Sequence, residues 1–463
     1  MFEFNINDYK YKNIHMIGIG GISMSGIAIL LNNNGYKVTG SDISISETSK
    51  HLDKNGIKYT IGQKKENIKN PDLVIYTDAI AENNEELIAA RKLDIPVVSR
   101  GVFLGSLMKN YKNSIAVSGS HGKSTTTSMI SKILMYSTKN PTILLGGDLD
   151  EIEGNVHVGD KDILVTEACE YKGNIRYYYP SIGIILNIDE DHLDYYKDIN
   201  DIVETFKFYL RNQSKDSKTI LNLNEENNKL VIDAVQGELI TYGQDNPDAD
   251  YNATNISFDE SGKPRFDLIM KNGDVEHFEL AILGRHNINN ACASIIATLE
   301  SGVDIKTIKK NIQSYTGLER RMQLMGNVND CNIILDYGHH PSEIQVNLNA
   351  LAEHTKGRLI CVWQPHTYTR TKRLFNEFVK CFDEADEVII TDIFAAREPF
   401  DPSISSKDVV DALIKTGKSA KYIPTFEKVK EYLLSDIKKD DQVIVTGSGD
   451  SDRLARMIAG VSE

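Results

Sequence analysis

Short runs of β-branched and aliphatic residues alternate along the chain with longer segments whose apolar positions recur at helical spacing. This alternation is typical of parallel sheets whose strands are joined by helical crossovers. The first group of elements consists of a buried strand entering a glycine turn, a helix and three further strands. They are predicted at residues 13–21, 24–35, 36–42, 72–80 and 95–100.

The pattern restarts after residues 101–111 and again near residue 331. In the second group, residues 242–278 are rich in Asp, Asn, Gly and Ser and predict a small antiparallel excursion, and a helix is predicted at 285–302. The other predicted strands of the second and third groups lie in segments 114–118, 142–148, 162–168, 181–189, 217–224, 331–344, 358–366, 387–394 and 441–450. We therefore predict three α/β domains, at residues 1–110, 111–318 and 319–463.

Bulk composition narrows the class of protein. A chain of 463 residues is too long to fold around a single hydrophobic core, so several domains are expected. The net charge of −14 argues against non-specific binding of nucleic acid or an anionic membrane. The five cysteines have no metal-binding spacing, so we expect reduced thiols, and neither a leader sequence nor an 18-residue apolar run is recognisable. These features predict a cytoplasmic protein without nucleic-acid or membrane partners, and they leave a monomer and a homodimer open.

The first glycine turn resembles a dinucleotide-binding fingerprint. Gly18, Gly20 and Gly21 follow a strand, and Ser41 and Asp42 end the next one. Glycines let backbone N–H groups approach a pyrophosphate at a helix N-terminus, and an acidic residue at the second strand can meet a ribose hydroxyl. NAD, a sugar nucleotide and plain strand-to-helix packing are all compatible with this pattern.

The stretch from Gly119 to Thr125 predicts a phosphate-binding loop more strongly. The usual first glycine is replaced by Val117, but Gly119 and Gly122 permit the turn. Lys123 would reach the outer phosphates of a nucleotide, and a hydroxyl at Ser124 or Thr125 can ligate Mg²⁺. We expect the lysine side chain to lie in a solvent-filled site.

Acidic residues and a histidine follow two later strands of the same group. Glu167 and Glu170 come at the end of one strand, where a Mg²⁺ ligand beside a phosphate loop belongs. The second strand is followed by Asn187, Asp191, His192 and Asp194, and an isolated histidine there is equally compatible with a structural role.

Further polar groups gather near the second junction and in the third domain. Asn287 and Asn290 suit an adenine edge, although helix capping explains them equally well, and Arg320 can reach a transferred phosphate or form a surface ion pair. The third domain carries a basic cluster that favours an anion pocket, with a solvated basic face as the alternative. Its residues are His339, His340, His366, Arg370, Lys372 and Arg373.

In order along the chain, these motifs resemble the Mur ligase family of peptidoglycan synthesis. The resemblance rests on GIGGISMSGIA, TGSD, GSHGKSTTT, TEACE, NIDEDHLDYY, GRHN, LERRM, DYGHHPSEI, QPHTYTRT and TGSGDS, which span essentially the whole chain. It implies a Rossmann-like N-terminal domain, a central P-loop ATPase-like domain with a parallel sheet, and a Rossmann-like C-terminal domain. It also implies an ATP-dependent ligase that joins L-alanine to UDP-N-acetylmuramate through an acyl phosphate.

The resemblance also implies the roles of individual residues. Catalysis would involve Lys123, Glu167 and His192, and Mg²⁺ would be held through Ser124, Glu167 and His192. ATP would be bound by Gly119, Ser120, His121, Gly122, Lys123, Ser124, Thr125, Asn287, Asn290 and Arg320. The sugar nucleotide would be bound by Gly18, Gly20, Gly21, Ser23, Ser41 and Asp42, and the amino acid by Tyr337, His339, His340 and Arg370.

The chain departs from the family pattern at two informative places. Thr367 stands where many relatives carry arginine, so the work of that arginine would fall to Arg370 or a neighbour. The TEACE segment is less acidic than usual, which leaves Glu170 open as a second metal ligand. Two rival functions also remain: a recycling ligase that attaches a preformed tripeptide to the same sugar nucleotide, and an NAD-dependent oxidoreductase.

Overall fold

A computed structural model describes residues 2–45, 47–192, 195–259, 262–396 and 398–461. The chain divides into two compact units. The first comprises Met1–Ala253, Leu268–Asp274 and Asn289–Ile312, and the second comprises Thr254–Asp267, Val275–Ile288 and Gln313–Glu463. Among the described residues, no helix combines the length and the apolar character that a membrane crossing requires.

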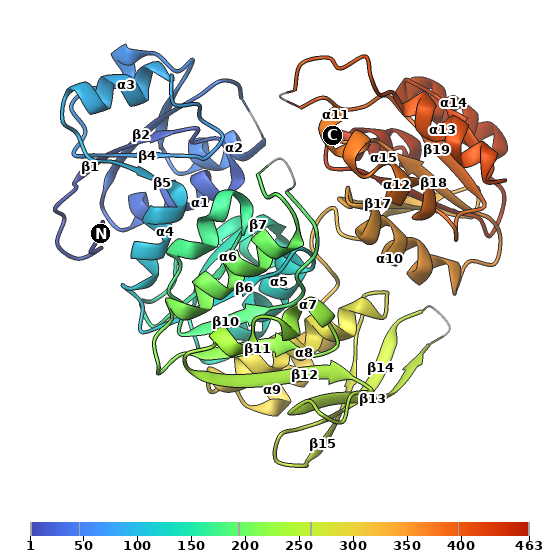
Figure 1. The fold of residues 1–463 in the computed structure, drawn as a ribbon, viewed down its shortest axis with the longest axis horizontal. Helices are drawn as coiled ribbons and strands as arrows, with labels where there is room; N and C mark the ends of the chain where they lie inside the picture. The colour runs from blue at the N-terminus through green and yellow to red at the C-terminus, as the bar shows by residue number, and fades with distance from the viewer. Residues whose placement is uncertain (1, 46, 193–194, 260–261, 397, 462–463) are drawn as a thin grey trace. The chain divides into compact units, whose positions relative to one another are not determined.

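The first sheet, in the first unit, is parallel with the order β3-β2-β1-β4-β5 (Figure 1). Its inner strand β1 reads NIHMI and has four buried residues in succession, as expected for a strand covered on both faces. The strands are β1 (Asn13–Ile17), β2 (Lys37–Asp42), β3 (Lys58–Ile61), β4 (Leu73–Tyr76) and β5 (Val97–Ser99), and the helices are α1 (Ile22–Asn33), α2 (Glu47–Lys54), α3 (Glu85–Lys92) and α4 (Arg100–Met108).

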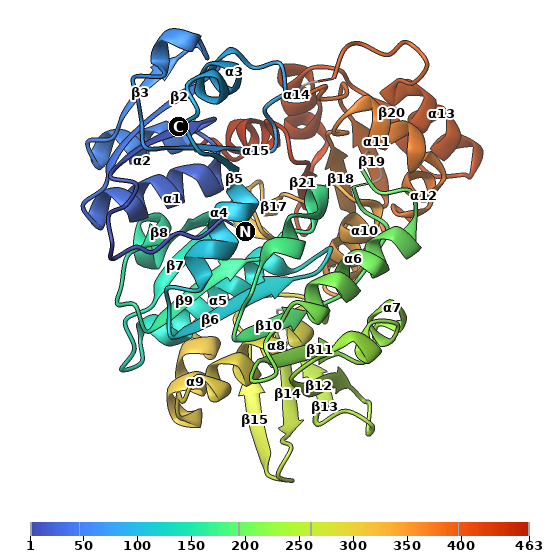
Figure 2. The same cartoon turned by 60° about the vertical axis from the view of Figure 1, so that its left-hand side comes forward.

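The second sheet has the order β12-β11-β10-β6-β9-β7-β8 within the first unit. Its remaining strands are β13 and β14, whose residues are divided between the two units, and β15, whose residues belong to the second unit. Its pairs are parallel from β12 to β7, and β8 is antiparallel. Helix α1, which follows the first strand of the first sheet, packs against β7 (Figures 1 and 2) and against β8 (Figure 2).

The strands of this sheet are β6 (Asn113–Ser118), β7 (Thr142–Leu149), β8 (Gly154–His157), β9 (Ile163–Glu167), β10 (Ile182–Ile185), β11 (Lys218–Asn222), β12 (Glu238–Gln244), β13 (Tyr251–Phe258), β14 (Pro264–Ile269) and β15 (Val275–Glu279). The helices that accompany it are α5 (Lys123–Met135), α6 (Ile199–Arg211), α7 (Glu226–Lys229), α8 (His286–Glu300) and α9 (Ile305–Gln313).

The third sheet, in the second unit, has the order β16-β17-β21-β18-β19-β20. Among the described residues of this sheet, β16·β17 is the one antiparallel pair, and the other pairs are parallel. Its strands are β16 (Gln323–Val328), β17 (Cys331–Asp336), β18 (Leu359–Trp363), β19 (Glu387–Ile390), β20 (Ala420–Tyr422) and β21 (Gln442–Thr446). Its helices are α10 (Pro341–Ala352), α11 (Tyr368–Arg373), α12 (Phe375–Lys380), α13 (Ser406–Lys415), α14 (Phe426–Asp436) and α15 (Ser451–Ala459).

The predicted α/β class with parallel-rich sheets is confirmed, but one detail is wrong. The predicted antiparallel excursion begins with a parallel pair, because Tyr242 of β12 lies opposite Tyr251 of β13. Residues 245–250 loop back, and β13 then continues in the same direction as β12. The parallel direction of β13 depends on the path of this loop, and the alternation of polar and apolar residues does not reveal it.

Candidate active site

The phosphate-type loop lies between the central strand β6 and helix α5. Gly119 and Gly122 have φ of +139° and +81°, so both occupy backbone conformations that favour glycine. A Cβ at Gly122 would lie 2.6 Å from Oδ1 of Asn290, so this asparagine of α8 packs closely against the turn. The chain therefore enters α5 with its backbone N–H groups at the carboxyl end of the sheet, where an anion is favoured.

An asparagine from the next strand end fixes the loop. The side chain of Asn187 accepts a hydrogen bond from the His121 N–H at 2.8 Å and donates to the His121 carbonyl at 3.1 Å. The Ser120 hydroxyl bonds the Asp189 main chain, and His121 Nε2 lies 3.5 Å from an Asp189 carboxylate oxygen. Sequence patterns assign no role to Asn187, and its position directly after the buried strand β10 is the signal that could reveal one.

Lys123 forms a buried ion pair, which corrects the expectation of a solvent-filled site. Its side chain is 14% exposed, and Nζ lies 3.3 Å from Glu170, whose side chain is 2% exposed. Nζ also donates to the carbonyls of Gly119 and Ser120. Burial opposes the ammonium charge, but the Glu170 carboxylate outweighs it and raises the pKa of Lys123 above its ordinary value.

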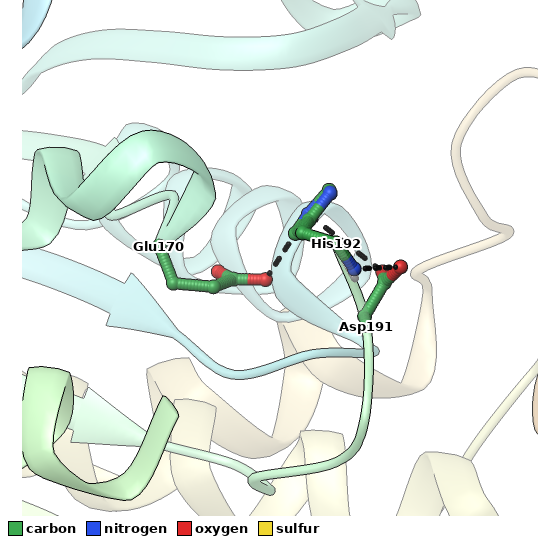
Figure 3. Close-up of side chains that lie close together, drawn as sticks. All are labelled: Glu170, Asp191 and His192. Carbon is green, nitrogen blue, oxygen red and sulfur yellow. Dashed lines mark hydrogen bonds and ion pairs between the residues drawn. The ribbon is translucent and has the colours of Figure 1, made fainter. Parts of the chain in front are cut away.

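Glu170, Asp191 and His192 form a cluster with the donor set of a metal site (Figure 3). One ligand atom from each lies within 4.8 Å of the others. His192 Nε2 is 3.5 Å from Glu170 and 3.7 Å from Asp191. Burial raises the pKa of Glu170, but the nearby Lys123 and His192 bring it below its ordinary value, so the carboxylate is charged.

The family resemblance implies Ser124, Glu167 and His192 as the metal ligands. The observed cluster instead joins His192 to Glu170 and Asp191. Glu167, at the end of β9, accepts a hydrogen bond from the Gly146 N–H at 2.8 Å. Ser124 is the second residue of α5 and Thr125 the third. Asp194 lies outside the described residues. The sequence leaves Glu170 open as a metal ligand and assigns no role to Asp191, although both lie in the polar segments that follow β9 and β10.

The first glycine turn connects β1 to α1, and one of its three glycines has a positive φ. Gly18 has φ of +79°, and a Cβ there would lie 2.4 Å from the Thr77 side chain. The Gly20 N–H donates to the Asp42 carboxylate at 2.8 Å, so this acid braces the turn. Gly21 immediately precedes α1 as its N-cap.

The two serines of this region have protein partners. The Ser41 hydroxyl is fully buried and donates to Glu86 at 2.6 Å, while its carbonyl accepts from the N–H groups of Gly18 and Ile19. Ser23, in the first turn of α1, accepts from Arg100 at 3.3 Å. Ser41 thus supports the turn through its backbone, and its side chain points into the core.

In the second unit, Arg320 and Tyr337 lie together. The Arg320 guanidinium is 5.1 Å from the Tyr337 ring centroid and donates to the Gly449 carbonyl at 3.0 Å. The Tyr337 N–H donates to the Arg320 carbonyl at 2.7 Å. Asn287 belongs to this unit by its contacts, and its side chain donates to the Leu283 carbonyl at 2.6 Å.

The predicted basic cluster is partly assembled at the strand ends of the third sheet. The rings of His339 and His366 are 6.1 Å apart, and Arg370 lies 3.2 Å from His366 Nδ1. Burial and then the Arg370 charge lower the pKa of His366 to about 4, so the imidazole is neutral and accepts from the guanidinium. His340 instead caps α10 through its contact with the Ser342 N–H.

The fold and these sites define a phosphate-loop α/β protein, and comparison with known proteins gives its family. Family models described as "Mur ligase family, catalytic domain", "Mur ligase middle domain" and "Mur ligase, glutamate ligase domain" match residues 13–112, 117–298 and 320–449. The chain belongs to the Mur ligase family.

Similar proteins carry a more specific name. A UDP-N-acetylmuramate–L-alanine ligase of Clostridium botulinum (strain Okra / Type B1) is 44% identical over 98% of this chain and 99% of its own. A protein of the same name from Acetivibrio thermocellus is 43% identical over 97% of this chain and 96% of its own. The crystal structure of UDP-N-acetylmuramate-alanine ligase from Thermotoga maritima aligns with a TM-score of 0.81 and 26% identity, covering 97% of this chain and 98% of that one.

Proposed function

We propose that this protein is an ATP-dependent ligase of peptidoglycan synthesis that acts in the cytoplasm. It joins the amine of L-alanine to the lactyl carboxylate of UDP-N-acetylmuramate and releases ADP and phosphate. The observation that carries the proposal is the similarity at 44% identity along 98% of the chain to ligases named for this reaction. The phosphate-type loop with its charged Lys123 supports it independently.

The chemistry required is activation of a carboxylate, which is a poor electrophile because oxygen leaves it poorly. Transfer of the γ-phosphoryl group of ATP to the carboxylate gives an acyl phosphate. Attack by the alanine amine then forms the amide and expels phosphate. Lys123 and the backbone N–H groups around Gly122 would stabilise the negative charge that develops on the transferring group.

The buried cluster fits a divalent cation. Two carboxylates and one imidazole converge within 4.8 Å, beside the loop that would carry the nucleotide phosphates. We propose that Glu170, Asp191 and His192 hold Mg²⁺, together with Ser124, which follows Lys123, and Glu167, which lies three residues before Glu170. When bound, the ion would add positive charge against the ATP phosphates.

Each domain would contribute one substrate site. Residues 1–110 would bind the UDP sugar through the turn at Gly18, Gly20 and Gly21, with Asp42 and Ser23 beside it. Residues 111–318 would bind ATP, with Asn290 packed on the loop and Asn287 at the adenine. Residues 319–463 would bind alanine through Tyr337, His339, His340 and Arg370, and Arg320 would serve the phosphate. Closure of the domains would exclude water, which otherwise hydrolyses an acyl phosphate.

The rivals are less well supported. A murein peptide ligase from Psychrobacter arcticus shares the fold with a TM-score of 0.72, but its 23% identity supports the fold alone. An NAD-dependent oxidoreductase would use the first glycine turn but leaves the loop at Lys123 and the buried cluster without a purpose.

A competition assay tests the proposal. The protein is incubated with UDP-N-acetylmuramate, ATP, Mg²⁺ and equal concentrations of L-alanine and the murein tripeptide, and products are identified by mass spectrometry. We expect UDP-N-acetylmuramoyl-L-alanine as the main product. Predominance of the tripeptide adduct would establish the recycling ligase, and absence of both with oxidation of added NADH would favour the oxidoreductase.

A further inference from the structure

The short turn that follows Glu170 determines where that carboxylate lies. Glu170 precedes the 3₁₀ segment η3 (Tyr171–Tyr177), and its carbonyl accepts hydrogen bonds from the Gly173 N–H and the Tyr196 hydroxyl. Lys172 and Gly173 have φ of +53° and +70°, so the chain bends sharply just after Glu170. Groups that fix this bend therefore fix the position of Glu170.

A residue that follows a strand of the first sheet contacts the bend at two points. Asp78 lies two residues beyond β4, at the carboxyl edge of that sheet. Its carboxylate accepts from Asn174 Nδ2 at 2.7 Å, and its carbonyl accepts from Lys172 Nζ at 2.5 Å. These contacts join positions 96 and 94 residues apart in the chain. Asn174 is only 2% exposed, so its hydrogen bond is shielded from water.

Two glycines of α4 bring the same segment unusually close. A Cβ at Gly101 would lie 2.0 Å from Asn174 Oδ1, and one at Gly105 would lie 1.8 Å from the Tyr177 carbonyl oxygen. Residues four apart share one face of a helix, so this face of α4 touches both halves of η3. The bend is thus held between Asp78 and α4.

We propose that Asp78 is a positioning residue for Glu170. Through its hydrogen bonds with Asn174 and Lys172, Asp78 ties the bend after Glu170 to the end of a strand of the first sheet. The position of Glu170 relative to Asp191 and His192 would therefore depend on Asp78. The inference rests on the proposed role of that cluster in holding a divalent cation. It predicts that metal affinity depends on a carboxylate that contacts neither the metal ligands nor the phosphate loop.

Replacement of Asp78, with a matched control, tests this role. Mn²⁺ is titrated by electron paramagnetic resonance into the full chain with saturating ADP. We expect Asp78→Ala to weaken Mn²⁺ binding about tenfold, the scale seen when a group that orients a metal ligand is removed. Asp78→Asn keeps an oxygen that accepts from Asn174, so its affinity should stay within about twofold of wild type.

Asp72 supplies the control. It stands at the other end of β4, where its carboxylate accepts from the Asn13 N–H at 2.7 Å and from Asn13 Nδ2 at 3.1 Å. Asp72→Ala should lower stability while leaving Mn²⁺ affinity unchanged. Asn174→Ala removes the Asp78 hydrogen bond from its other end, and it replaces Asp78→Ala if that variant does not fold.

Three results would overturn the inference. These are wild-type Mn²⁺ affinity in folded Asp78→Ala or Asn174→Ala, equal weakening in Asp72→Ala, and no Mn²⁺ binding by the wild-type protein. None of them depends on product formation. The substrate assay therefore tests the proposed function separately, and a protein that binds Mn²⁺ but makes no amide would fail only that proposal.

Discussion

At the scale of single residues, Lys123 has a contact in the structure that its sequence motif does not predict. The glycine–lysine spacing predicts a phosphate ligand, but the structure makes the same ammonium group the partner of a nearly buried carboxylate. Removing one member of a buried ion pair leaves an uncompensated charge. The lysine therefore has a structural role as well as the proposed chemical one.

The first prediction separates these two roles. Lys123→Ala should reduce turnover about a hundredfold or more, because it removes a main stabiliser of phosphoryl charge. It should also lower the free energy of unfolding by about 3 kcal/mol through the stranded Glu170. The double variant Lys123→Met, Glu170→Gln should regain stability but not turnover. Urea unfolding and steady-state kinetics measure both effects, and near wild-type turnover in Lys123→Ala would refute the loop assignment.

A second residue-scale prediction concerns acid stability. The pKa of His366 is about 4 in the folded protein, because burial and then Arg370 disfavour its charge, whereas an unfolded histidine has a pKa near 6.5. The unfolded chain therefore binds more protons between these values. As the pH falls from about 6.5 to 4, this histidine should cost up to about 3 kcal/mol of stability.

His366→Asn tests the assignment, because its amide oxygen can still accept from Arg370 while the side chain no longer titrates. Urea midpoints at pH 7.5 and 4.5 should show a smaller acid-induced loss in the variant than in the wild type. Equal losses in both proteins would show that another group is responsible.

At the scale of elements, strand prediction succeeded where burial was continuous and failed mostly at sheet edges. Strands such as β1, β6, β10 and β18 are predicted because almost every residue in them is buried. Of the strands that were not predicted, β3, β8, β16 and β20 are edge strands, whereas β12, which begins before the predicted excursion at residue 242, lies inside its sheet. One flank of an edge strand has no neighbour, so its sequence need not be apolar, as KYTI in β3 illustrates.

The contact between α4 and η3 gives the prediction at this scale. Alanine at Gly105 would raise the intrinsic helix propensity of α4 by about 1 kcal/mol. Its Cβ would however lie 1.8 Å from the Tyr177 carbonyl oxygen, which is backbone and cannot turn away. We expect overpacking to prevail and Gly105→Ala to lose about 1–3 kcal/mol in urea unfolding.

Gly326→Ala is the comparison for this change. A Cβ there would meet its nearest neighbour, the Ala459 side chain, at 3.4 Å, which is an ordinary contact. It should therefore lose clearly less stability than Gly105→Ala. Equal effects of the two substitutions would mean that the close approach of α4 to η3 is not what requires glycine.

At the scale of the whole molecule, the proposed reaction predicts which nucleotide product is formed. A loop of this type grips the outer phosphates and presents the γ-phosphoryl group for transfer, while the α-phosphate is poorly placed for attack. ADP and phosphate should therefore form in step with amide, with little ADP when UDP-N-acetylmuramate is omitted. Without alanine, hydroxylamine should trap an acyl phosphate. Chromatography of the nucleotides decides the matter, and AMP as the main product would overturn the mechanism.

The sequence by itself determined the α/β class, the two glycine turns and the order of the polar segments that follow the strands. Each of these is local: a buried strand needs a run of apolar residues, and a tight turn at Gly18 or Gly122 needs a backbone free to take positive φ. For the same reason, Lys123 and His192 could be named before their surroundings were known.

Only the tertiary structure decided which side chains meet. Glu170 and Asp191 join His192 because β9 and β10 flank β6, so that segments distant in sequence end at one edge of the sheet. Ser41 faces Glu86, and Asp78 reaches Asn174, through contacts between residues 45 and 96 positions apart. Such pairings depend on strand order and helix packing. The local pattern of polar and apolar residues does not show which residues distant in sequence will meet.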